Sequence, residues 1–434
     1  MDPKRLMIAA LVLIGLSGAL WWSNKQEAEN VSKPAADAPP KVLEIPQDQI
    51  NKIEIRRMGA EPVVVSKGAA WTLTAPKALA ADGDAVNAVV STLAVLTSER
   101  LVDEKAADFG PYGLKSPILT VVASRKDGKS HTLHLGDDAP SGASTYARVE
   151  GEQRLFLVPS STKASLEKTW RDLRDKRLLT FDSEKLTRVE LGAIEFGKNN
   201  ANAWTILKPK ALRADNFAAE ELVRKLKDAK MEVTNDTEAE AKWPAAFAGG
   251  TPVGIAKVTD NNGTQQIEVR VGKEKDYYAK SSALEGIYRT TAELGEGLAK
   301  KLDDFRNKKL FEFGFNMPDR VEVKQDGATY VFTKAGADWK RDGKTIDPGS
   351  VQQLVDRLRE LTAAKFADAA AGAPAAEYSV GKEKVTVTKQ GEAYFARRSN
   401  EPEVYVLDAT AVAEIKDLAA AAKEVAPPAA AQKK

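Results

Sequence analysis

The sequence predicts an α+β fold, in which an N-terminal transmembrane helix is followed by three tandem α+β modules with mainly antiparallel sheets. Three observations lead to this prediction. Residues 6–22 form an uncharged apolar stretch close to the N-terminus. A tryptophan recurs about every 133 residues, at Trp71, Trp204 and Trp339. An amphipathic helical pattern and then several alternating strand patterns follow each of these tryptophans, as in a tandem repeat.

Length and charge restrict the class of protein. The chain has 434 residues, enough for about three domains. Its 64 Lys and Arg residues nearly balance its 62 Asp and Glu residues. Because nucleic-acid binding needs a basic surface, we expect no nucleic-acid partner. The chain has no cysteine, which excludes disulfides, thiolate metal sites and a cysteine nucleophile.

The apolar stretch near the N-terminus predicts a single-pass membrane anchor. Residues 1–23 are interpreted as a cytoplasmic stub and a transmembrane helix, which would cover about 26 Å. Lys4 and Arg5 precede the apolar stretch and Trp21 and Trp22 end it. This polarity leaves the N-terminus in the cytoplasm and puts the body in the periplasm or outside the cell, with an inner-membrane location.

A cleaved signal peptide is the alternative interpretation of the same segment. Ser17 and Ala19 could form a small-residue cleavage site before Leu20. Both interpretations send the remaining chain across the membrane.

Composition divides the remaining chain. Residues 24–41 and 421–434 are rich in Ala, Pro and charge without an apolar period, which predicts a disordered tether and a disordered tail. Between them we expect module 1 at residues 42–183, module 2 at 184–316 and a shortened module 3 at 317–420.

Each module is expected to open with short strands. The segments "IEI", "VEL" and "VEV", which begin at Ile53, Val189 and Val321, alternate apolar and polar residues with the period of a half-buried strand. Each recurring tryptophan then lies in a further short strand.

The first helix of each module is predicted from a cap and an apolar stripe. "PKALAAD" (76–82) and "PKALRAD" (209–215) both end in an aspartate, and Asp347 has the same place in the third module. An aspartate before a helix accepts hydrogen bonds from free backbone N–H groups, so all three are predicted N-caps. The apolar residues that follow have the spacing i, i+3, i+4, i+7, i+10 and form one stripe on a helix. They are Val86, Val89, Val90, Leu93 and Leu96; Ala219, Leu222, Val223, Leu226 and Ala229; and Val351, Leu354, Val355, Leu358 and Leu361.

About four strands and a second helix are expected to complete each module. "RDK" (174–176) and "RNK" (306–308) come just before the next module and are interpreted as connectors between modules. The third module ends without such a basic segment.

The candidate binding surface consists of the three tryptophans and three cations. Trp71, Trp204 and Trp339 are either core residues or rings that stack on a ligand. Arg148, Lys280 and Arg397 occupy matched places in three predicted hairpins. They are either solvated strand charges or a basic face that meets an acidic partner.

No catalytic residue, cofactor or metal site is predicted. His131 and His134 are three apart on a strand, so their side chains should point to opposite faces. Two acidic pairs, Asp137 with Asp138 and Asp303 with Asp304, are adjacent in sequence, which does not place two carboxyls across a cleft.

Several motifs of the first module together resemble one family. They are "YGLKSP" (112–117), "LHLG" (133–136), "YARV" (146–149), "LFLV" (155–158) and "LRDKRLL" (173–179). Their order is similar to that in the domain of unknown function 4340 family. The resemblance covers module 1 well, module 2 moderately and module 3 weakly. It implies a bacterial envelope protein with an N-terminal membrane segment and no assigned enzymatic activity, considered alongside ABC-transporter components of the gliding-motility type.

Three functions follow as hypotheses. The first is a membrane-anchored extracytoplasmic scaffold or interaction protein, an accessory subunit of an envelope ABC-transport assembly, whose partners are other envelope proteins. The second is a module that binds a small molecule or an envelope glycan, with the tryptophans exposed in grooves. The third is a carboxylate-dependent hydrolase.

Overall fold

The chain folds into two compact units, the first ending at Lys176 and the second beginning at Arg177. The computed structural model describes residues 39–425. The first unit contains one sheet and the second contains two, and each sheet has its own hydrophobic core. All strand pairs in these sheets are antiparallel, so the predicted α+β class with antiparallel sheets is confirmed.

The transmembrane segment predicted at residues 6–22 lies outside the described residues. Within residues 39–425, no helix combines the length and the apolar character that crossing a membrane requires.

Module 1 is built on a nine-stranded sheet in the order β4-β3-β2-β1-β6-β7-β8-β9-β5. Its strands are β1 (Ile50–Arg57), β2 (Val63–Lys67), β3 (Trp71–Ala75), β4 (Leu79–Ala80), β5 (Arg100–Asp103), β6 (Leu119–Arg125), β7 (Ser130–Asp138), β8 (Ser144–Val149) and β9 (Leu155–Pro159). Its helices are η1 (Gln47–Gln49), α2 (Gly83–Ala94), η2 (Gly110–Tyr112), α3 (Ser160–Leu166) and α4 (Trp170–Leu173).

Module 2 has an eight-stranded sheet in the order β13-β12-β11-β10-β14-β15-β16-β17. Its strands are β10 (Arg188–Leu191), β11 (Ile194–Lys198), β12 (Trp204–Lys208), β13 (Leu212–Arg213), β14 (Thr251–Asp260), β15 (Gly263–Val271), β16 (Tyr277–Ser281) and β17 (Tyr288–Thr290). Its helices are α5 (Asn216–Lys227), α6 (Thr237–Ala248), α7 (Ala292–Ala299) and α8 (Leu302–Phe305).

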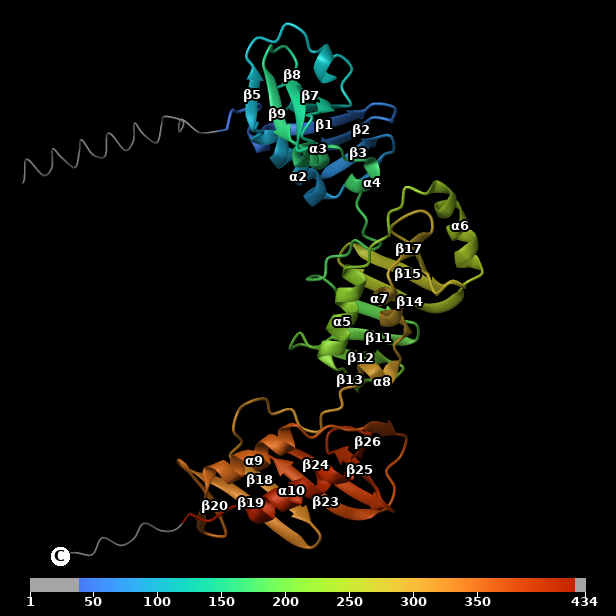
Figure 1. Cartoon of the computed structure of the whole chain (residues 1–434). Coiled ribbons are helices and arrows are strands. Elements are labelled where there is room, and N and C mark those ends of the chain that lie inside the picture. The colour runs from blue at the N-terminus through green and yellow to red at the C-terminus, as the bar shows by residue number, and fades with distance from the viewer. Residues whose placement is uncertain (1–38, 426–434) are drawn as a thin grey trace, which may run out of the picture. The chain divides into compact units, whose positions relative to one another are not determined.

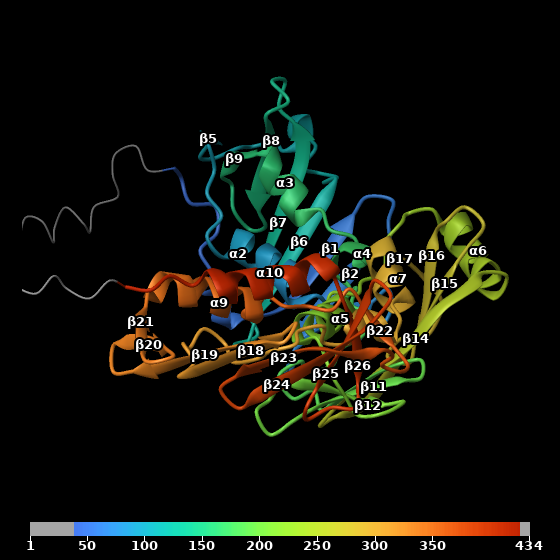
Figure 2. The same cartoon turned by 90° about the horizontal axis from the view of Figure 1, so that it is seen from below.

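Module 3 returns to nine strands, in the order β21-β20-β19-β18-β23-β24-β25-β26-β22. Its strands are β18 (Arg320–Gln325), β19 (Ala328–Ala335), β20 (Asp338–Arg341), β21 (Lys344–Ile346), β22 (Lys365–Ala367), β23 (Ala373–Val380), β24 (Glu383–Gln390), β25 (Ala393–Arg398) and β26 (Val404–Leu407). Its helices, α9 (Pro348–Arg359) and α10 (Ala409–Ala421), lie side by side across one face of the sheet (Figures 1 and 2).

The predicted N-caps explain where the first helix of each module begins. The Asp82 carboxylate accepts hydrogen bonds from the backbone N–H groups of Asp84 and Ala85. Asp215 accepts one from Ala218 and Asp347 accepts one from Ser350. The predicted apolar stripes then face the sheets, because all of their residues lie in or against the three cores.

The three modules also end in the same way. The backbone N–H of each cap aspartate donates a hydrogen bond to a carbonyl of its own module's closing segment: Asp82 to Leu173, Asp215 to Phe305 and Asp347 to Lys423. Module 3 therefore keeps a closing segment, although it lacks the basic motif. Ala422 is buried and Glu424 forms a β-bridge with Ile346, so part of the predicted tail belongs to this module.

The predicted limits of the modules differ from the cores. Leu178, Leu179 and Phe181, which we assigned to module 1, are buried in the second core. Leu310 and Phe311, which we assigned to module 2, are buried in the third. After each basic connector, one further cation, Arg177 or Lys309, precedes the apolar residues of the next core.

The predicted tether also overlaps the fold. Pro40 accepts a hydrogen bond from the backbone N–H of Ser98, and Lys41 forms a β-bridge with Thr97. Of the predicted tether, residues 24–41, the structure describes only residues 39–41.

Module 2 differs from the others at one sheet edge. After the first helix, modules 1 and 3 add an edge strand, β5 against β9 and β22 against β26. Module 2 instead forms α6, which contacts β16 and β17. This helix was not expected from the sequence pattern.

Candidate functional site

The three tryptophans occupy equivalent places in the three cores. Trp71, Trp204 and Trp339 are only 5%, 4% and 3% exposed. Each pairs in register with a lysine of the neighbouring strand: Lys67, Lys198 and Lys334. Their rings are part of the cores and have almost no exposed surface for stacking on a ligand.

Arg148, Lys280 and Arg397 also occupy equivalent places. Each follows a fully buried alanine, and neighbouring residues on a strand point to opposite faces. The three cations therefore project from the sheet face that lies opposite the core helices, which we call the outer face. Lys280 and Arg397 are exposed, whereas Arg148 is half-buried with its guanidinium 4.5 Å from the centre of the Phe109 ring.

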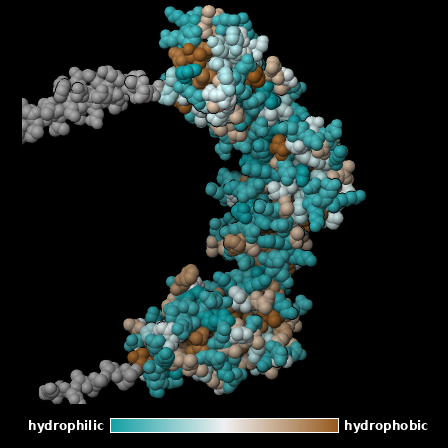
Figure 3. All heavy atoms as spheres, in the orientation of Figure 1, coloured by the Kyte–Doolittle hydropathy of each residue, from teal (hydrophilic) through white to brown (hydrophobic). Residues whose placement is uncertain are grey.

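Ion pairs cover much of the outer face of module 3. Glu322 lies 2.7 Å from Lys324 and 2.9 Å from Arg320. Lys324 also pairs with Glu377 at 3.1 Å. Hydrogen bonds from Lys324 and then Arg320 hold the pKa of Glu322 below its usual range. The visible surface of the molecule is accordingly largely hydrophilic (Figure 3).

The two histidines show no arrangement for binding a metal. His131 and His134 lie on opposite faces of β7, and the His134 Nδ1 atom lies 3.2 Å from the Thr120 hydroxyl. Burial, and then the nearby Arg148, lower the pKa of His134. Within residues 39–425, no group of three or more His, Asp or Glu residues could hold a metal ion.

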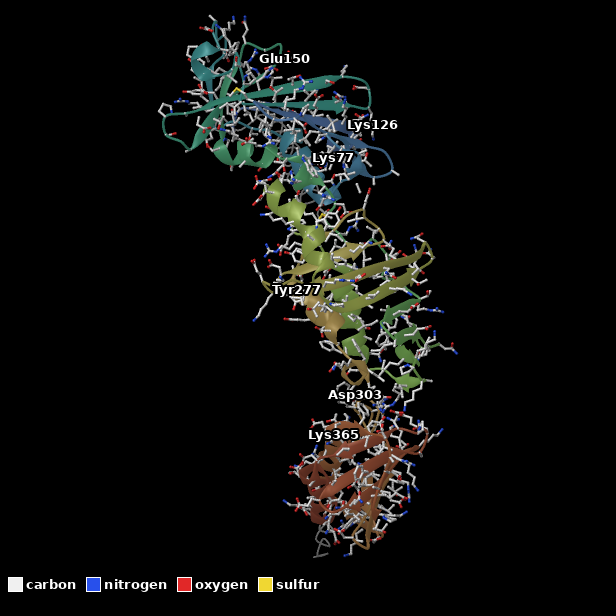
Figure 4. All side chains as sticks on the ribbon, turned by 90° about the vertical axis from the view of Figure 1, so that its right-hand side faces the viewer. Lys77, Lys126, Glu150, Tyr277, Asp303 and Lys365 are labelled. Carbon is white, nitrogen blue, oxygen red and sulfur yellow. The ribbon has the colours of Figure 1, made fainter. Side chains whose placement is uncertain are left out.

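Three of the four acids in the adjacent pairs serve local structure. The Asp138 carboxylate accepts hydrogen bonds from the Thr145 hydroxyl at 2.6 Å and from Lys163 at 3.1 Å, and both lower its pKa. Asp303, labelled in Figure 4, pairs with Arg306 at 2.9 Å. Asp304 accepts a hydrogen bond from the backbone N–H of Lys301.

The motifs of the family resemblance form one cluster in module 1. A Cβ atom on Gly136 would lie 2.1 Å from the Tyr112 carbonyl oxygen, so only glycine allows this approach. The rings of Tyr112 and Tyr146 are 4.8 Å apart, and Leu114 packs with Leu155. "YGLKSP" thus forms a loop that packs over part of the outer face.

A second cluster joins modules 2 and 3, and sequence reasoning missed it. The repeated stretch "PKALRAD" contributes Lys210 and Arg213, which reach the β25–β26 hairpin of module 3. Arg213 lies 2.6 Å from Glu401 and donates a hydrogen bond to the Tyr405 hydroxyl at 3.0 Å. Lys210 pairs with Glu403 at 2.8 Å. We call this cluster the junction.

Arg306 of the "RNK" connector completes the junction. It forms an ion pair with Glu403, and its guanidinium lies 3.4 Å from the centre of the Phe366 ring. The Arg306 and Glu403 side chains are only 12% and 6% exposed. Although burial acts to lower the pKa of Arg213, Tyr405 and Glu312 hold it above its usual value.

The repeat itself contained a signal for the junction. "PKALAAD" and "PKALRAD" differ only at the position of Ala80 and Arg213. The second stretch has a long cationic side chain, Arg213, where the first has alanine. This difference indicates that the second stretch does more than begin a helix. Its partners are 188 and 192 residues away in sequence, so they could not be found from local patterns.

These findings define a class of protein: a tandem array of α+β modules, each with an antiparallel sheet, a main hydrophobic core on one face of that sheet and a capped first helix. The model of the family Domain of unknown function (DUF4340) matches residues 71–202 and 204–380, and the two matches begin at Trp71 and Trp204. The chain belongs to this family, as its motifs indicated. No curated protein and no solved structure matches the chain.

Proposed function

We propose that the protein is a membrane-anchored extracytoplasmic scaffold that serves as an accessory subunit of an envelope ABC-transport assembly. Residues 1–23 would anchor it in the inner membrane, and the modules would present interaction surfaces on the far side. The proposal gives the protein no catalytic role, and its partners are other envelope proteins.

The junction is the observation that carries this proposal. A scaffold has to hold its binding surfaces at a fixed spacing, and domains joined by a short linker alone move relative to each other. Three cations of module 2 pair with acidic residues of module 3, and the two modules form one compact unit. The burial of Trp71, Trp204 and Trp339 supplies further support, because within residues 39–425 these three rings are core residues and not a surface for stacking on a glycan.

The location can be tested with topology reporters. Alkaline phosphatase, which is active only outside the cytoplasm, is fused after Lys41. We expect an active enzyme in the membrane fraction, and release of the protein into the soluble fraction when a signal-peptidase site replaces residues 17–19. An inactive fusion would contradict the extracytoplasmic location.

The partner can be tested by crosslinking in living cells. A photo-crosslinking amino acid replaces Lys280 or Arg397, which are exposed at equivalent places on two outer faces. Lys227 on α5 and Gln353 on α9 are exposed controls on the helical side. We expect transporter subunits to be crosslinked from the outer-face positions and not from the controls. Equal capture from all four positions, or capture of lipid alone, would exclude the accessory-subunit proposal.

A further inference from the structure

A groove in module 2 lies between α6 and the turn that follows β15. Its volume is about 440 Å³, which falls in the range of small-molecule sites. Both views place α6 beside β15 (Figures 1 and 2). The groove is lined by Lys242, Ala245, Ala246, Gly249, Gly272, Lys273, Glu274 and Tyr278.

Tyr278 lines this groove with an unpartnered hydroxyl. Its side chain projects from β16 away from the main core and packs with Trp243 and Phe247 of α6. Although Tyr278 is only 9% exposed, its hydroxyl makes no hydrogen bond within residues 39–425. The hydroxyl is not one of the buried polar atoms that lack a partner, so it is accessible from the groove and can donate a hydrogen bond to a ligand.

Small residues keep the groove open beside the tyrosine ring. A Cβ atom on Gly272 would lie 2.9 Å from the Tyr278 ring, so a larger residue there would displace the ring. Tyr146 occupies the equivalent place in module 1, where the Tyr112 ring covers it at 4.8 Å. In module 2, Trp243 and Phe247 pack against the tyrosine instead, and the small residues Ala245 and Gly249 beside them line the open groove.

The charges at the groove favour an anion. Lys242 and Lys273 are exposed on opposite sides of it, one on α6 and one on the turn. Within the described chain, neither lysine forms an ion pair, and Glu274 is the one acid among the lining residues. Two unpaired ammonium groups beside a free hydroxyl donor fit a carboxylate.

We propose that this groove binds a small organic carboxylate with an aromatic or branched apolar body. The body lies in the groove against Ala245, Gly249 and Gly272, beside the exposed edge of Tyr278. The carboxylate accepts a hydrogen bond from the Tyr278 hydroxyl and pairs with Lys242 and Lys273. This activity goes beyond the scaffold function and does not depend on it.

The test uses the full-length protein in detergent and ligand-observed NMR. The probes are benzoate, phenylacetate and 4-methylpentanoate, with benzyl alcohol as the uncharged counterpart of benzoate. We expect at least one carboxylate to bind, and benzyl alcohol to bind about tenfold more weakly than benzoate.

Four variants locate the site. Ala245→Trp fills the groove from an exposed position and should abolish binding. Tyr278→Phe keeps the ring and should weaken binding about tenfold, as should Lys273→Gln. Lys227→Gln, which removes an exposed lysine from α5, should leave the affinity unchanged.

Each contrary result overturns the proposal. If none of the three carboxylates binds, the groove is not a carboxylate site. If a carboxylate binds Ala245→Trp as tightly as the unaltered protein, with both folded by circular dichroism, the binding lies elsewhere. Equal affinity for benzoate and benzyl alcohol would exclude recognition of the charge.

Discussion

Ion pairs of the same chemistry have different environments in this protein. At the junction, the side chains of Glu403 and Arg306 are both almost completely buried. On the outer face, Lys324 also pairs with a glutamate, Glu322, but the Lys324 side chain is 46% exposed. Solvent screens the exposed pair, so its net contribution to stability is small. Removing one partner of a buried pair leaves an uncompensated charge, which is costly.

We therefore expect Glu403→Gln to lower the free energy of unfolding of the second unit by about 3 kcal/mol. Glu322→Gln is the matched control and should cost less than about 1 kcal/mol. Urea unfolding followed by circular dichroism measures both. Equal costs for the two substitutions would contradict the buried state of the junction.

Tyr378 should make stability fall at alkaline pH. Its buried hydroxyl donates a hydrogen bond to Gln325 at 3.0 Å, and burial, then Tyr394 and Asp326, raise its pKa. Below pH of about 10, the tyrosine is neutral in both the folded and the unfolded state, so its contribution does not change with pH. Above that pH the unfolded chain loses the proton and the folded chain keeps it. Stability is then lost by up to about 1.4 kcal/mol per pH unit.

Tyr378→Phe should remove this dependence. The variant is expected to be less stable at pH 7, because Gln325 loses its hydrogen bond, and its stability should fall less steeply above pH 10. Unfolding in urea at several pH values gives both slopes. If the free energy of unfolding falls equally steeply with pH in the variant and in the unaltered protein, the pKa of Tyr378 is not raised in the folded state.

At the level of elements, glycines allow the closest backbone contacts. Gly136 at the end of β7 approaches the loop that contains Tyr112, whereas Gly83 at the start of α2 has no other group within 4 Å of its Cβ position. The same added methyl group therefore has opposite consequences at the two places.

Gly136→Ala should destabilise module 1 by about 2 kcal/mol or more, because the loop or the strand has to move. Gly83→Ala should be neutral or stabilise by up to about 1 kcal/mol, since alanine favours a helix. Thermal unfolding measures both. If Gly136→Ala is as stable as the unaltered protein, the loop that contains Tyr112 does not pack closely against β7.

The elements that local patterns define could be predicted from the sequence. Asp82, Asp215 and Asp347 cap helices because capping needs only a carboxylate and the next three backbone N–H groups. The apolar stripes, the alternating strands and the recurrence of the tryptophans were sufficient to predict the repeated α+β plan. The sequence also predicted the equivalence of Arg148, Lys280 and Arg397, but not that Phe109 would cover the first of them.

Features that depend on distant residues could not be predicted in this way. Residues 237–248 have no long apolar stripe, so the sequence pattern did not predict α6. The helix packs on Tyr278 through Trp243 and Phe247, a contact that only the structure shows. The closing segment of module 3 was missed because Lys423 acts through its backbone carbonyl, which has no sequence signature. The ion pairs that Lys210 and Arg213 make at the junction join residues almost two hundred positions apart.

At the scale of the whole molecule, the junction should make modules 2 and 3 unfold together. Leu226 of α5 and Leu358 of α9 are both fully buried, one in each core of the second unit. Changing either leucine to alanine leaves a cavity that costs about 3 kcal/mol. Because the junction couples the two cores, both substitutions should lower the temperature of the same calorimetric transition.

Arg306→Gln supplies the decisive comparison, because it breaks the buried pair with Glu403 and leaves both cores intact. In this background, Leu226→Ala and Leu358→Ala should lower two separate transitions. Hydrogen exchange of α5 and α9 should then also diverge, since cooperative units of a protein exchange together only while they are coupled. If the unaltered protein already shows two transitions, the ion pairs at the junction hold the modules in contact but do not make them unfold as one unit. A rigid spacing between the modules would then need another cause.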